Sequence, residues 1–288
     1  MIGHPFTYRS PESAAEAVEL VSAAPARTRV LGGGTWVVPE CNRGESAPDL
    51  LVDLRRAGLD RIELVDDVVH VGATTTYTAL MSSAIVLGHL PMLAAMARGI
   101  TGGAQVQSQG TIGGSVVAAR PQSDAPAVVA ALGATLVMAG SQGERRVSGE
   151  AMFEAASRSC VRPDEILTRL EIPVQGAARW GYYKLKRSAS SWPIATAAFV
   201  VDQHGSGSVT DARLVLGGVS GTPVHVDVRS VLVGGPLEPG RVDEAARLVA
   251  ASVHSPWEDE LAPGSYRLAV THPVARRAME MAMQQEDS

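Results

Sequence analysis

The sequence predicts an α+β protein with two domains, and three observations predict it. Helical stretches alternate with β-rich runs, glycine-rich segments interrupt this alternation, and a short Gly-Ala-Ala segment at residues 176–178 separates two unequal parts. We expect a larger domain over residues 1–176 and a smaller one over residues 177–288. With 288 residues, of which 45% are hydrophobic, the chain is long enough to bury a core in each domain.

The larger domain is expected to begin with a helix followed by strands. Ser10 and the proline after it predict a helix start, because serine caps helices and proline suits the first helical position. Residues 28–31 form a β-rich run that leads directly into three glycines, and residues 50–54 and 68–72 read as two further strands. A glycine turn that follows a buried strand is rigidly placed, which favours a binding site there.

Later segments of this domain are expected to be mainly helical. Residues 78–87 and 91–97 carry apolar residues at helical spacing, and residues 127–132 follow a helix-capping sequence. Residues 134–139 then read as a strand.

The smaller domain is expected to place strands before helices. Three β-rich segments are predicted at residues 181–187, 195–202 and 209–216, with a turn at Ser206–Ser208 between the last two. Helices are expected at residues 228–233, 242–253 and 272–283.

Two glycine-rich segments are the strongest candidates for a ligand site. Glycines lack a Cβ atom, so their backbone can adopt positive φ and approach another molecule closely. Successive N–H groups in such a segment form a concave anion site, to which a threonine hydroxyl adds a donor. Two such segments could bind a diphosphate between them, each donating hydrogen bonds from its own side. Their residues are Leu31, Gly32, Gly33, Gly34, Thr35 and Trp36 in the first, and Gly110, Thr111, Ile112, Gly113, Gly114 and Ser115 in the second.

Neither segment matches a general nucleotide-binding motif. The first lacks the lysine and spacing of a Walker loop, and neither shows G-x-G-x-x-G at a strand–helix junction. The residues alone therefore leave two interpretations open, a phosphate or dinucleotide site and a purely structural pair of turns.

Composition and charge argue against several classes of function. The net charge of −5 and isoelectric point of about 5.8 give no basic footprint for nucleic acid. No apolar run approaches the roughly 18 residues that a membrane span requires. The seven histidines are scattered, so no metal site is expected. Cys41 and Cys160 are the only cysteines and cannot hold an iron–sulfur cluster, and they favour a reducing cytoplasm.

Several ordered motifs resemble the FAD-binding medium subunit of the molybdenum hydroxylases, the xanthine dehydrogenase and aerobic carbon monoxide dehydrogenase type. They include Leu31–Thr35 followed by Pro39, and Thr111–Gly114 followed by Pro121, Asp124 and Pro126. Asp164–Pro173 is similar to the strand that closes the FAD domain of that family, and Tyr183–Arg187 to the opening of its C-terminal domain. The resemblance runs over essentially the whole chain.

The resemblance implies a fold and a cofactor. The fold would be a two-lobed FAD-binding domain of the vanillyl-alcohol oxidase type, followed by a small α+β C-terminal domain with a three-stranded sheet. The cofactor would be FAD. Its diphosphate would be bound by the backbone N–H groups of Gly33, Gly34 and Thr35 and by those of Gly113, Gly114 and Ser115, with hydroxyl donors from Thr35 and Thr111.

Further flavin contacts are implied at positions that match the family. Asp124, Leu167 and Lys184 would surround the flavin, where a lysine at the N1–C2=O end stabilises the anionic reduced ring. Thr101 stands where some relatives carry an aromatic residue, and Trp192 is placed to cover a flavin face. Without the resemblance, Asp124 caps a helix, Lys184 is an exposed strand lysine and Trp192 forms a packing corner with the next proline.

The resemblance also implies an oxidoreductase subunit without catalytic residues of its own, because the cofactor carries the chemistry. Substrate would be oxidised on a molybdopterin-binding large subunit. Electrons would pass through an iron–sulfur subunit to FAD and then to NAD or a quinone.

Two alternatives remain open. One is a stand-alone FAD oxidoreductase of the same fold, and the other is a flavin-free assembly subunit. Departures from the family pattern at Trp36, Gln107, Ser108 and Ala118 permit the second, whereas Ser115, in place of the usual asparagine, is a mild departure that keeps a donor.

Overall fold

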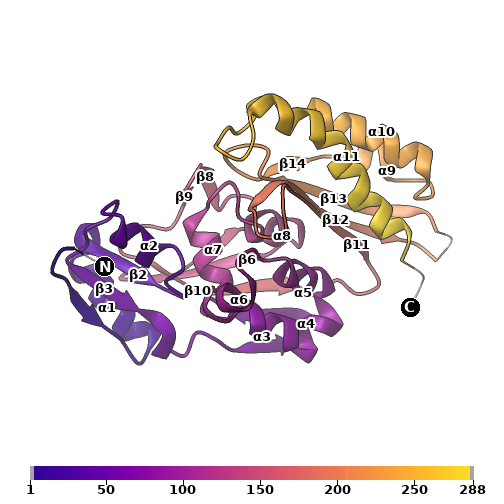
Figure 1. The fold of residues 1–288 in the computed structure, drawn as a ribbon. Coiled ribbons are helices and arrows are strands. Elements are labelled where there is room, and N and C mark those ends of the chain that lie inside the picture. Colours follow the sequence, from indigo (N-terminus) through magenta and orange to yellow (C-terminus); the bar gives the residue numbers. More distant parts are fainter. Residues whose placement is uncertain (1–2, 206, 286–288) are drawn as a thin grey trace.

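The computed structural model describes residues 3–205 and 207–285 (Figure 1). An N-terminal lobe, coloured indigo, lies beside a second lobe of helices and strands, and the C-terminal domain lies at the opposite end from the N-terminal lobe. The predicted boundary after Gly176 falls between the last strand of the second lobe, β10 (Ile166–Pro173), and the first strand of the C-terminal domain, β11 (Arg179–Lys186).

The N-terminal lobe is built on a small parallel sheet in the order β1-β3-β2, in which Leu31 pairs with Asp53. The expected first helix begins at Ala14, where the Ser13 hydroxyl accepts the Glu16 N–H, so the cap lies three residues beyond Ser10. The elements are β1 (Thr7–Arg9), α1 (Ala14–Ala23), β2 (Thr28–Leu31), α2 (Val37–Asn42) and β3 (Leu50–Asp53), with 3₁₀ turns at Pro25–Arg27 and Leu54–Arg56.

The second lobe is built on an antiparallel sheet in the order β4-β5-β10-β6-β7. The run that resembles the closing strand of the FAD domain forms β10 at the centre of this sheet, with an irregular register between Leu167 and Arg169. The other strands are β4 (Ile62–Val65), β5 (Val68–Gly72), β6 (Thr135–Gly140) and β7 (Gly143–Ser148), and a separate hairpin is formed by β8 (Phe153–Ala155) and β9 (Arg158–Ser159).

Six helices complete the second lobe, and two of them lie where no helix was expected. Glycines at residues 102–103 and 113–114 lower helix propensity and hid α6 and α7 from the sequence pattern. The helices are α3 (Tyr77–Ser82), α4 (Ala84–His89), α5 (Pro91–Arg98), α6 (Gly103–Gln109), α7 (Ile112–Ala118) and α8 (Ala125–Ala131).

Over its described residues, the C-terminal domain contains the three expected strands and one more. Its antiparallel sheet has the order β11-β12-β13-β14, and β14 has only three residues, too few to produce a readable alternation. The remaining elements are β12 (Pro193–Gln203), β13 (Val209–Gly217), β14 (Val224–Val226), α9 (Arg229–Leu232), α10 (Pro239–Ala251) and α11 (Gly264–Met283). The turn expected at Ser206–Ser208 includes Ser206, which lies outside the described residues.

Helix α11 begins at Gly264, well before the expected start at residue 272. Arg267 on its buried face is fully enclosed and interrupts the apolar pattern. Its guanidinium donates to the Ile194 and Gly218 carbonyls and pairs with Asp259, which fixes the start of the helix against the sheet. A buried arginine therefore stands where the sequence pattern of a helix would require a hydrophobic residue.

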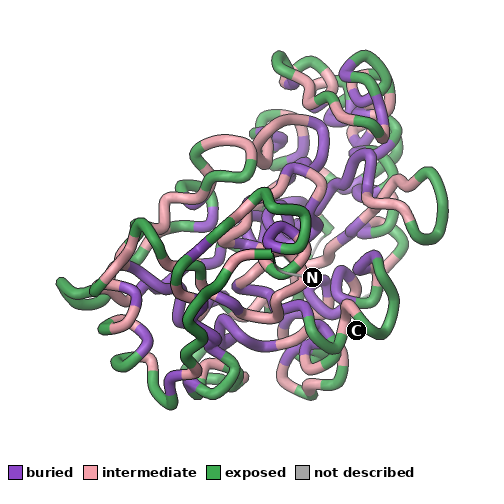
Figure 2. The backbone as a smooth tube through the Cα atoms, turned by 60° about the vertical axis from the view of Figure 1, so that its left-hand side comes forward, coloured by how far each residue is buried: buried purple, intermediate pink, exposed green. Residues whose placement is uncertain are grey.

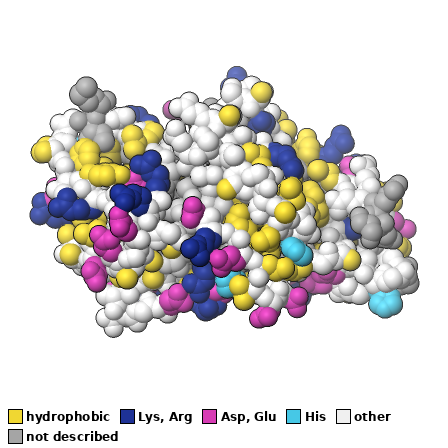
Figure 3. All heavy atoms as spheres, turned by 90° about the horizontal axis from the view of Figure 1, so that it is seen from below, with side chains coloured by type: hydrophobic (Ala, Val, Ile, Leu, Met, Phe, Trp, Pro, Cys, Tyr) yellow, Lys and Arg dark blue, Asp and Glu magenta, His cyan; other side chains and the backbone are white. Residues whose placement is uncertain are grey.

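Burial follows this layering, with buried segments in the interior and exposed loops around the rim (Figure 2). Strand β12 is contacted by α11 and by α8, which explains why its first nine residues are all buried. Seen from below, basic and acidic side chains are interspersed and hydrophobic side chains gather towards the middle of the face (Figure 3).

We predict that Gly181→Ala will destabilise the C-terminal domain by about 1–3 kcal/mol, the usual cost of overpacking. A Cβ atom at this position would lie 1.8 Å from the Ala278 carbonyl oxygen on α11, so strand and helix would have to separate. Urea unfolding measures the effect. Gly88→Ala is the control: it has open space within 4 Å in helix α4 and should be neutral or stabilising.

Candidate cofactor-binding site

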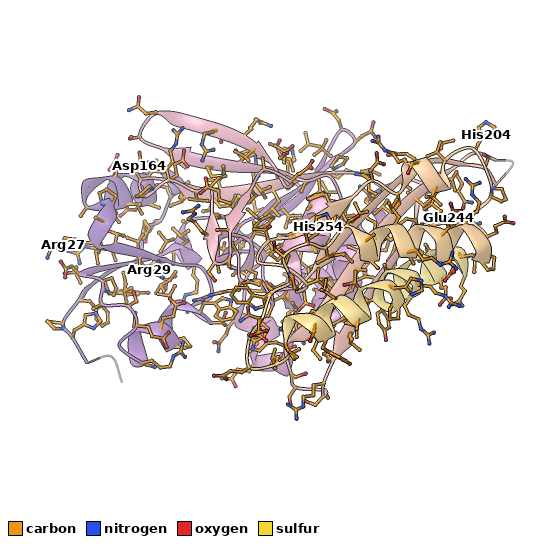
Figure 4. All side chains as sticks on the ribbon, turned by 90° about the horizontal axis from the view of Figure 1, so that it is seen from above. Arg27, Arg29, Asp164, His204, Glu244 and His254 are labelled. Carbon is orange, nitrogen blue, oxygen red and sulfur yellow. The ribbon has the colours of Figure 1, made fainter. Side chains whose placement is uncertain are left out.

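A cleft of about 560 Å³ separates the N-terminal lobe from the second lobe. Its walls come from the first glycine segment, α2, the start of α7, the β8–β9 hairpin and the start of β10. Arg29 on β2 is one of its charged lining residues, and Figure 4 shows it on the N-terminal lobe, far from Glu244 and His254 on the helical layer of the C-terminal domain.

The two glycine segments meet in this cleft, and they contact each other. A Cβ atom on Gly32 would lie 2.6 Å from Thr111 Oγ1, and one on Gly33 would lie 1.7 Å from the Gln109 carbonyl oxygen. The sequence suggested that these glycines admit a ligand. The structure adds a second reason for them, because any side chain at Gly33 would push the two segments apart.

The first segment presents open hydrogen-bond donors. Among the described residues, no acceptor binds the backbone N–H groups of Gly33, Gly34 or Thr35. Gly34 has a φ of +70°, which turns the chain after β2 and is favourable only for glycine. Adjacent, unsatisfied N–H groups on the wall of a cleft are suited to an anion.

The second segment corrects the prediction made for it. It is the start of helix α7, with Thr111 as the cap, and not an open turn. The N–H of Gly113 donates to Ala73 O (3.0 Å), that of Gly114 to Thr111 Oγ1 (3.1 Å) and that of Ser115 to Thr111 O (3.1 Å). These three donors are engaged within the chain, unlike the N–H groups of Gly33, Gly34 and Thr35, which have no acceptor among the described residues.

Two arginines and a carboxylate in the cleft were not anticipated from the sequence. Glu40 on α2 is buried and accepts hydrogen bonds from Arg29 (2.9 Å) and from Arg120, which follows α7. Arg120 also lies over the Trp36 ring, 5.3 Å from its centroid. The sequence carries little indication of a role for Arg120, whose only distinguishing feature is that it directly precedes a proline of the family motif.

Trp192 of the C-terminal domain reaches this wall. Its ring stacks on that of Trp36, with centroids 5.0 Å apart and an interplanar angle of 23°. Trp36 therefore has Arg120 and Trp192 as ring contacts, which gives a physical role to a residue that departs from the family pattern.

Asp124 and Lys184 form a buried ion pair at the domain interface. Lys184 Nζ lies 2.8 Å from Asp124 Oδ2, and the Tyr182 hydroxyl donates to the other carboxylate oxygen. Burial raises the pKa of Asp124 and of Tyr182, and it lowers the pKa of Lys184. The ion pair between Asp124 and Lys184 acts in the opposite direction on each of these two residues, because each charge stabilises the other. Asp124 makes no side-chain cap hydrogen bond to α8, so capping is not its role.

A pair of hydroxyl groups, one on a buried tyrosine and one on a partly buried serine, connects the interior of the second lobe to the cleft. The Tyr77 hydroxyl donates to Ser115 Oγ, and Ser115 lines the cleft. Burial raises the pKa of Tyr77, which keeps this phenol protonated and fixed as a donor.

The predicted site residues therefore divide into two groups. The cleft brings together Gly32, Gly33, Gly34, Thr35, Trp36, Thr111, Gly113, Gly114, Ser115 and Leu167. Leu31, Thr101, Gly110, Ile112, Asp124, Lys184 and Trp192 do not line it.

Among the described residues, no cluster of three or more histidine, cysteine, aspartate or glutamate side chains could hold a metal ion. None of the described helices is both long enough and apolar enough to span a bilayer.

Comparison with known proteins decides the family. Residues 4–175 match the model of the FAD binding domain in molybdopterin dehydrogenase, and residues 180–282 match that of the CO dehydrogenase flavoprotein C-terminal domain. The chain belongs to the FAD-binding medium subunits of the molybdenum hydroxylases. It is an oxidoreductase subunit whose cofactor is FAD, as the resemblance predicted.

Relatives match this flavin subunit over nearly its whole length. It is 33% identical to the carbon monoxide dehydrogenase medium chain of Afipia carboxidovorans, over 98% of each chain. It is 30% identical to the nicotine 6-hydroxylase medium subunit of Paenarthrobacter nicotinovorans, over 94% of this chain and 95% of that one.

Two solved structures have the same fold. One is carbon monoxide dehydrogenase from Hydrogenophaga pseudoflava, with a TM-score of 0.93 and 30% identity over 98% of this chain and 99% of that one. The other is quinoline 2-oxidoreductase from Pseudomonas putida 86, with a TM-score of 0.91 and 27% identity over 99% of each chain.

Glu165 at the rim of the cleft provides a prediction of pH dependence. Burial would raise the pKa of Glu165, but hydrogen bonds from Arg145 (2.9 and 2.6 Å) and from the Arg162 N–H outweigh it and hold the pKa below its usual value. A carboxyl whose folded-state pKa is depressed stabilises the fold above its unfolded-state pKa, and this contribution is lost as pH falls through the folded-state value.

We therefore expect Glu165→Gln to destabilise the flavin subunit near neutral pH by about 2 kcal/mol, the scale of hydrogen bonds to a charged group. The difference from wild type should shrink as the pH falls well below the ordinary carboxyl pKa. Urea unfolding at both pH values measures it. Glu260→Gln, at an exposed position, is the control and should unfold with the same free energy as the wild type at either pH. If Glu165→Gln and wild type differ in unfolding free energy by the same amount at low pH as at neutral pH, the depressed pKa of Glu165 is contradicted.

Proposed function

We propose that this chain is the electron-relay subunit of a heteromeric molybdenum hydroxylase. Electrons from a molybdopterin-binding large subunit would pass through an iron–sulfur subunit to FAD on this chain, and then to NAD or a quinone. Residues 1–176 would bind FAD and residues 177–288 would form the C-terminal domain of the subunit. A reducing cytoplasm is the proposed location, and both cysteines are free thiols, which is compatible with it.

The observation that carries the proposal is the cleft wall at Gly33–Thr35. Its three open N–H groups fit a ligand that brings negative charge and several acceptor oxygens, as a flavin dinucleotide does through its diphosphate. Arg29, Arg120 and Arg162 also line the cleft and make the surrounding field more favourable to an anion. The cleft is lined by residues of both lobes, so a ligand with a separate ring system and phosphate group could contact the two lobes at once.

FAD, when bound, would supply a carrier that can take up electrons one at a time and pass them on singly or as a pair. The residues of this chain would hold and orient it. Gly33, Gly34 and Thr35 would donate N–H groups to the diphosphate, and Leu167 would give the cleft an apolar wall. Lys184 would act at a distance, because its ammonium already contacts Gly99 O, Thr101 Oγ1 and Asp124 Oδ2.

The partner subunits follow from what this chain lacks. With Cys41 and Cys160 alone it cannot ligate an iron–sulfur cluster, so the cysteine-rich component would be a separate chain. Co-purification from the native host, followed by identification of the associated chains, tests this part. Recovery of the flavin subunit without companions that carry iron–sulfur and molybdopterin signatures would favour the stand-alone oxidoreductase.

We predict that the purified chain binds FAD and that Gly33→Ala weakens binding at least about tenfold. The added methyl group would collide with the Gln109 carbonyl and displace the open N–H groups from the cleft wall. Flavin fluorescence titration measures the dissociation constant, and near-UV circular dichroism checks that the variant is folded.

Gly240→Ala is the matched control, because this exposed glycine on α10 has open space within 4 Å. It should bind FAD as the wild type does. A folded wild-type chain that takes up no flavin, alone or with its partner chains, would refute the relay and leave an assembly role.

A further inference from the structure

The loop that carries Trp192 is held in shape by its own hydrogen bonds. It connects β11 to β12, and Ser191 Oγ accepts the N–H groups of Arg187 and Ser188, each at 3.0 Å. The same hydroxyl donates to Ser188 O (3.1 Å), and Lys186 Nζ donates to Ala189 O (2.9 Å). A closed loop of this kind moves as a unit, so a single external contact can set the position of Trp192.

That external contact comes from the FAD-binding domain. Thr101, which is only 7% exposed, donates its hydroxyl proton to Ser191 O at 3.0 Å, across 90 residues of sequence. The direction of this bond is fixed by chemistry. Lys184 Nζ lies 3.3 Å from the same Thr101 oxygen, and an ammonium can only donate, so the single hydroxyl proton of Thr101 is left for Ser191 O.

Lys184 is in turn fixed by two stronger contacts. It donates to Gly99 O and to Asp124 Oδ2, both at 2.8 Å, which together with Thr101 uses all three ammonium N–H groups. The Asp124 carboxylate is 1% exposed and also receives the Tyr182 hydroxyl. In such a dry environment each of these groups would be left unsatisfied by a small displacement, so the network has one favourable arrangement.

We propose that Thr101 is a positioning residue for the flavin site. It connects the buried Asp124–Lys184 ion pair to the 187–192 loop, and so holds Trp192 stacked on Trp36 at the wall of the cleft. The proposal deepens the proposed function, on which its flavin part rests. The stack joins the two domains at the cleft, and its role is to slow the release of FAD.

The stacked pair provides a readout that needs no flavin. Two tryptophan rings with centroids 5.0 Å apart couple their electronic transitions, which gives a couplet in circular dichroism. Trp36→Phe and Trp192→Phe each remove one partner and identify the signal in the flavin-free chain. Any loss of this couplet in a variant that keeps both tryptophans reports displacement of the loop.

The decisive variant is Thr101→Val, which keeps the shape of the side chain and removes the hydroxyl. We expect it to lose the tryptophan couplet and to release FAD on the order of tenfold faster, as loss of a buried hydrogen bond to a charged partner would produce. Thr271→Val is the matched control. Thr271 is also a buried threonine whose hydroxyl donates to a backbone carbonyl, Arg267 O at 2.8 Å, but it lies within α11. It should change neither signal.

Ser191→Ala provides a second variant that does not disturb the core, because Ser191 is only partly buried. It removes the internal bracing of the loop and should weaken the couplet and speed FAD release in the same direction. A couplet that persists in both Thr101→Val and Ser191→Ala would overturn the proposed connection. A lost couplet with unchanged FAD release would overturn its role in retaining FAD. Failure of the wild type to bind FAD would refute the proposed function and leave the couplet test of the connection standing.

Discussion

The close approach of Gly33 to the Gln109 carbonyl is the constraint on which the cofactor cleft depends. This approach brings the segment that follows strand β2 in the N-terminal lobe against the end of helix α6 in the second lobe, with no side chain between them. Because a Cβ atom at Gly33 has no space, the two lobes meet at a fixed spacing there and separate elsewhere to leave the cleft. The glycines thus set the geometry of the protein as well as its access to a ligand.

This contact also makes the cleft asymmetric in its chemistry. The N–H groups of Gly113, Gly114 and Ser115 bind Ala73 and Thr111, whereas those of Gly33, Gly34 and Thr35 have no acceptor within the part of the chain that the structure describes. Satisfying the donors on one side makes the α7 wall rigid, and leaving them open on the other creates the anion site. Arg120 and Glu40 then tie the two walls together by an ion pair beside that site.

Away from the lining of the cleft, a buried ion pair ties the FAD-binding domain to the C-terminal domain. Burial of Asp124 and Lys184 is costly for each charge, and the cost is offset only where every lone pair and proton has a partner. Here Tyr182, Thr101 and Gly99 O supply those partners, so the pair fixes the relative position of the domains. The resemblance placed these residues around the flavin. In the structure Asp124 and Lys184 do not line the cleft but pair with each other, and we propose that this network supports the segment that carries Trp192.

The sequence by itself determined the α+β class, most of the strands and helices, the FAD family and the lining residues of the first glycine segment. Apolar periodicity and ordered glycine motifs are local signals, so they can be read along the chain. Only the tertiary structure decided which donors remain open, that Gly113 and Gly114 begin a helix, and that Lys184 pairs with Asp124, 60 residues away. Arg120 and Glu40 were missed for the same reason, since hydrogen-bond partners distant in sequence leave no local pattern. Whether a polar group is free or engaged depends on what the fold places beside it.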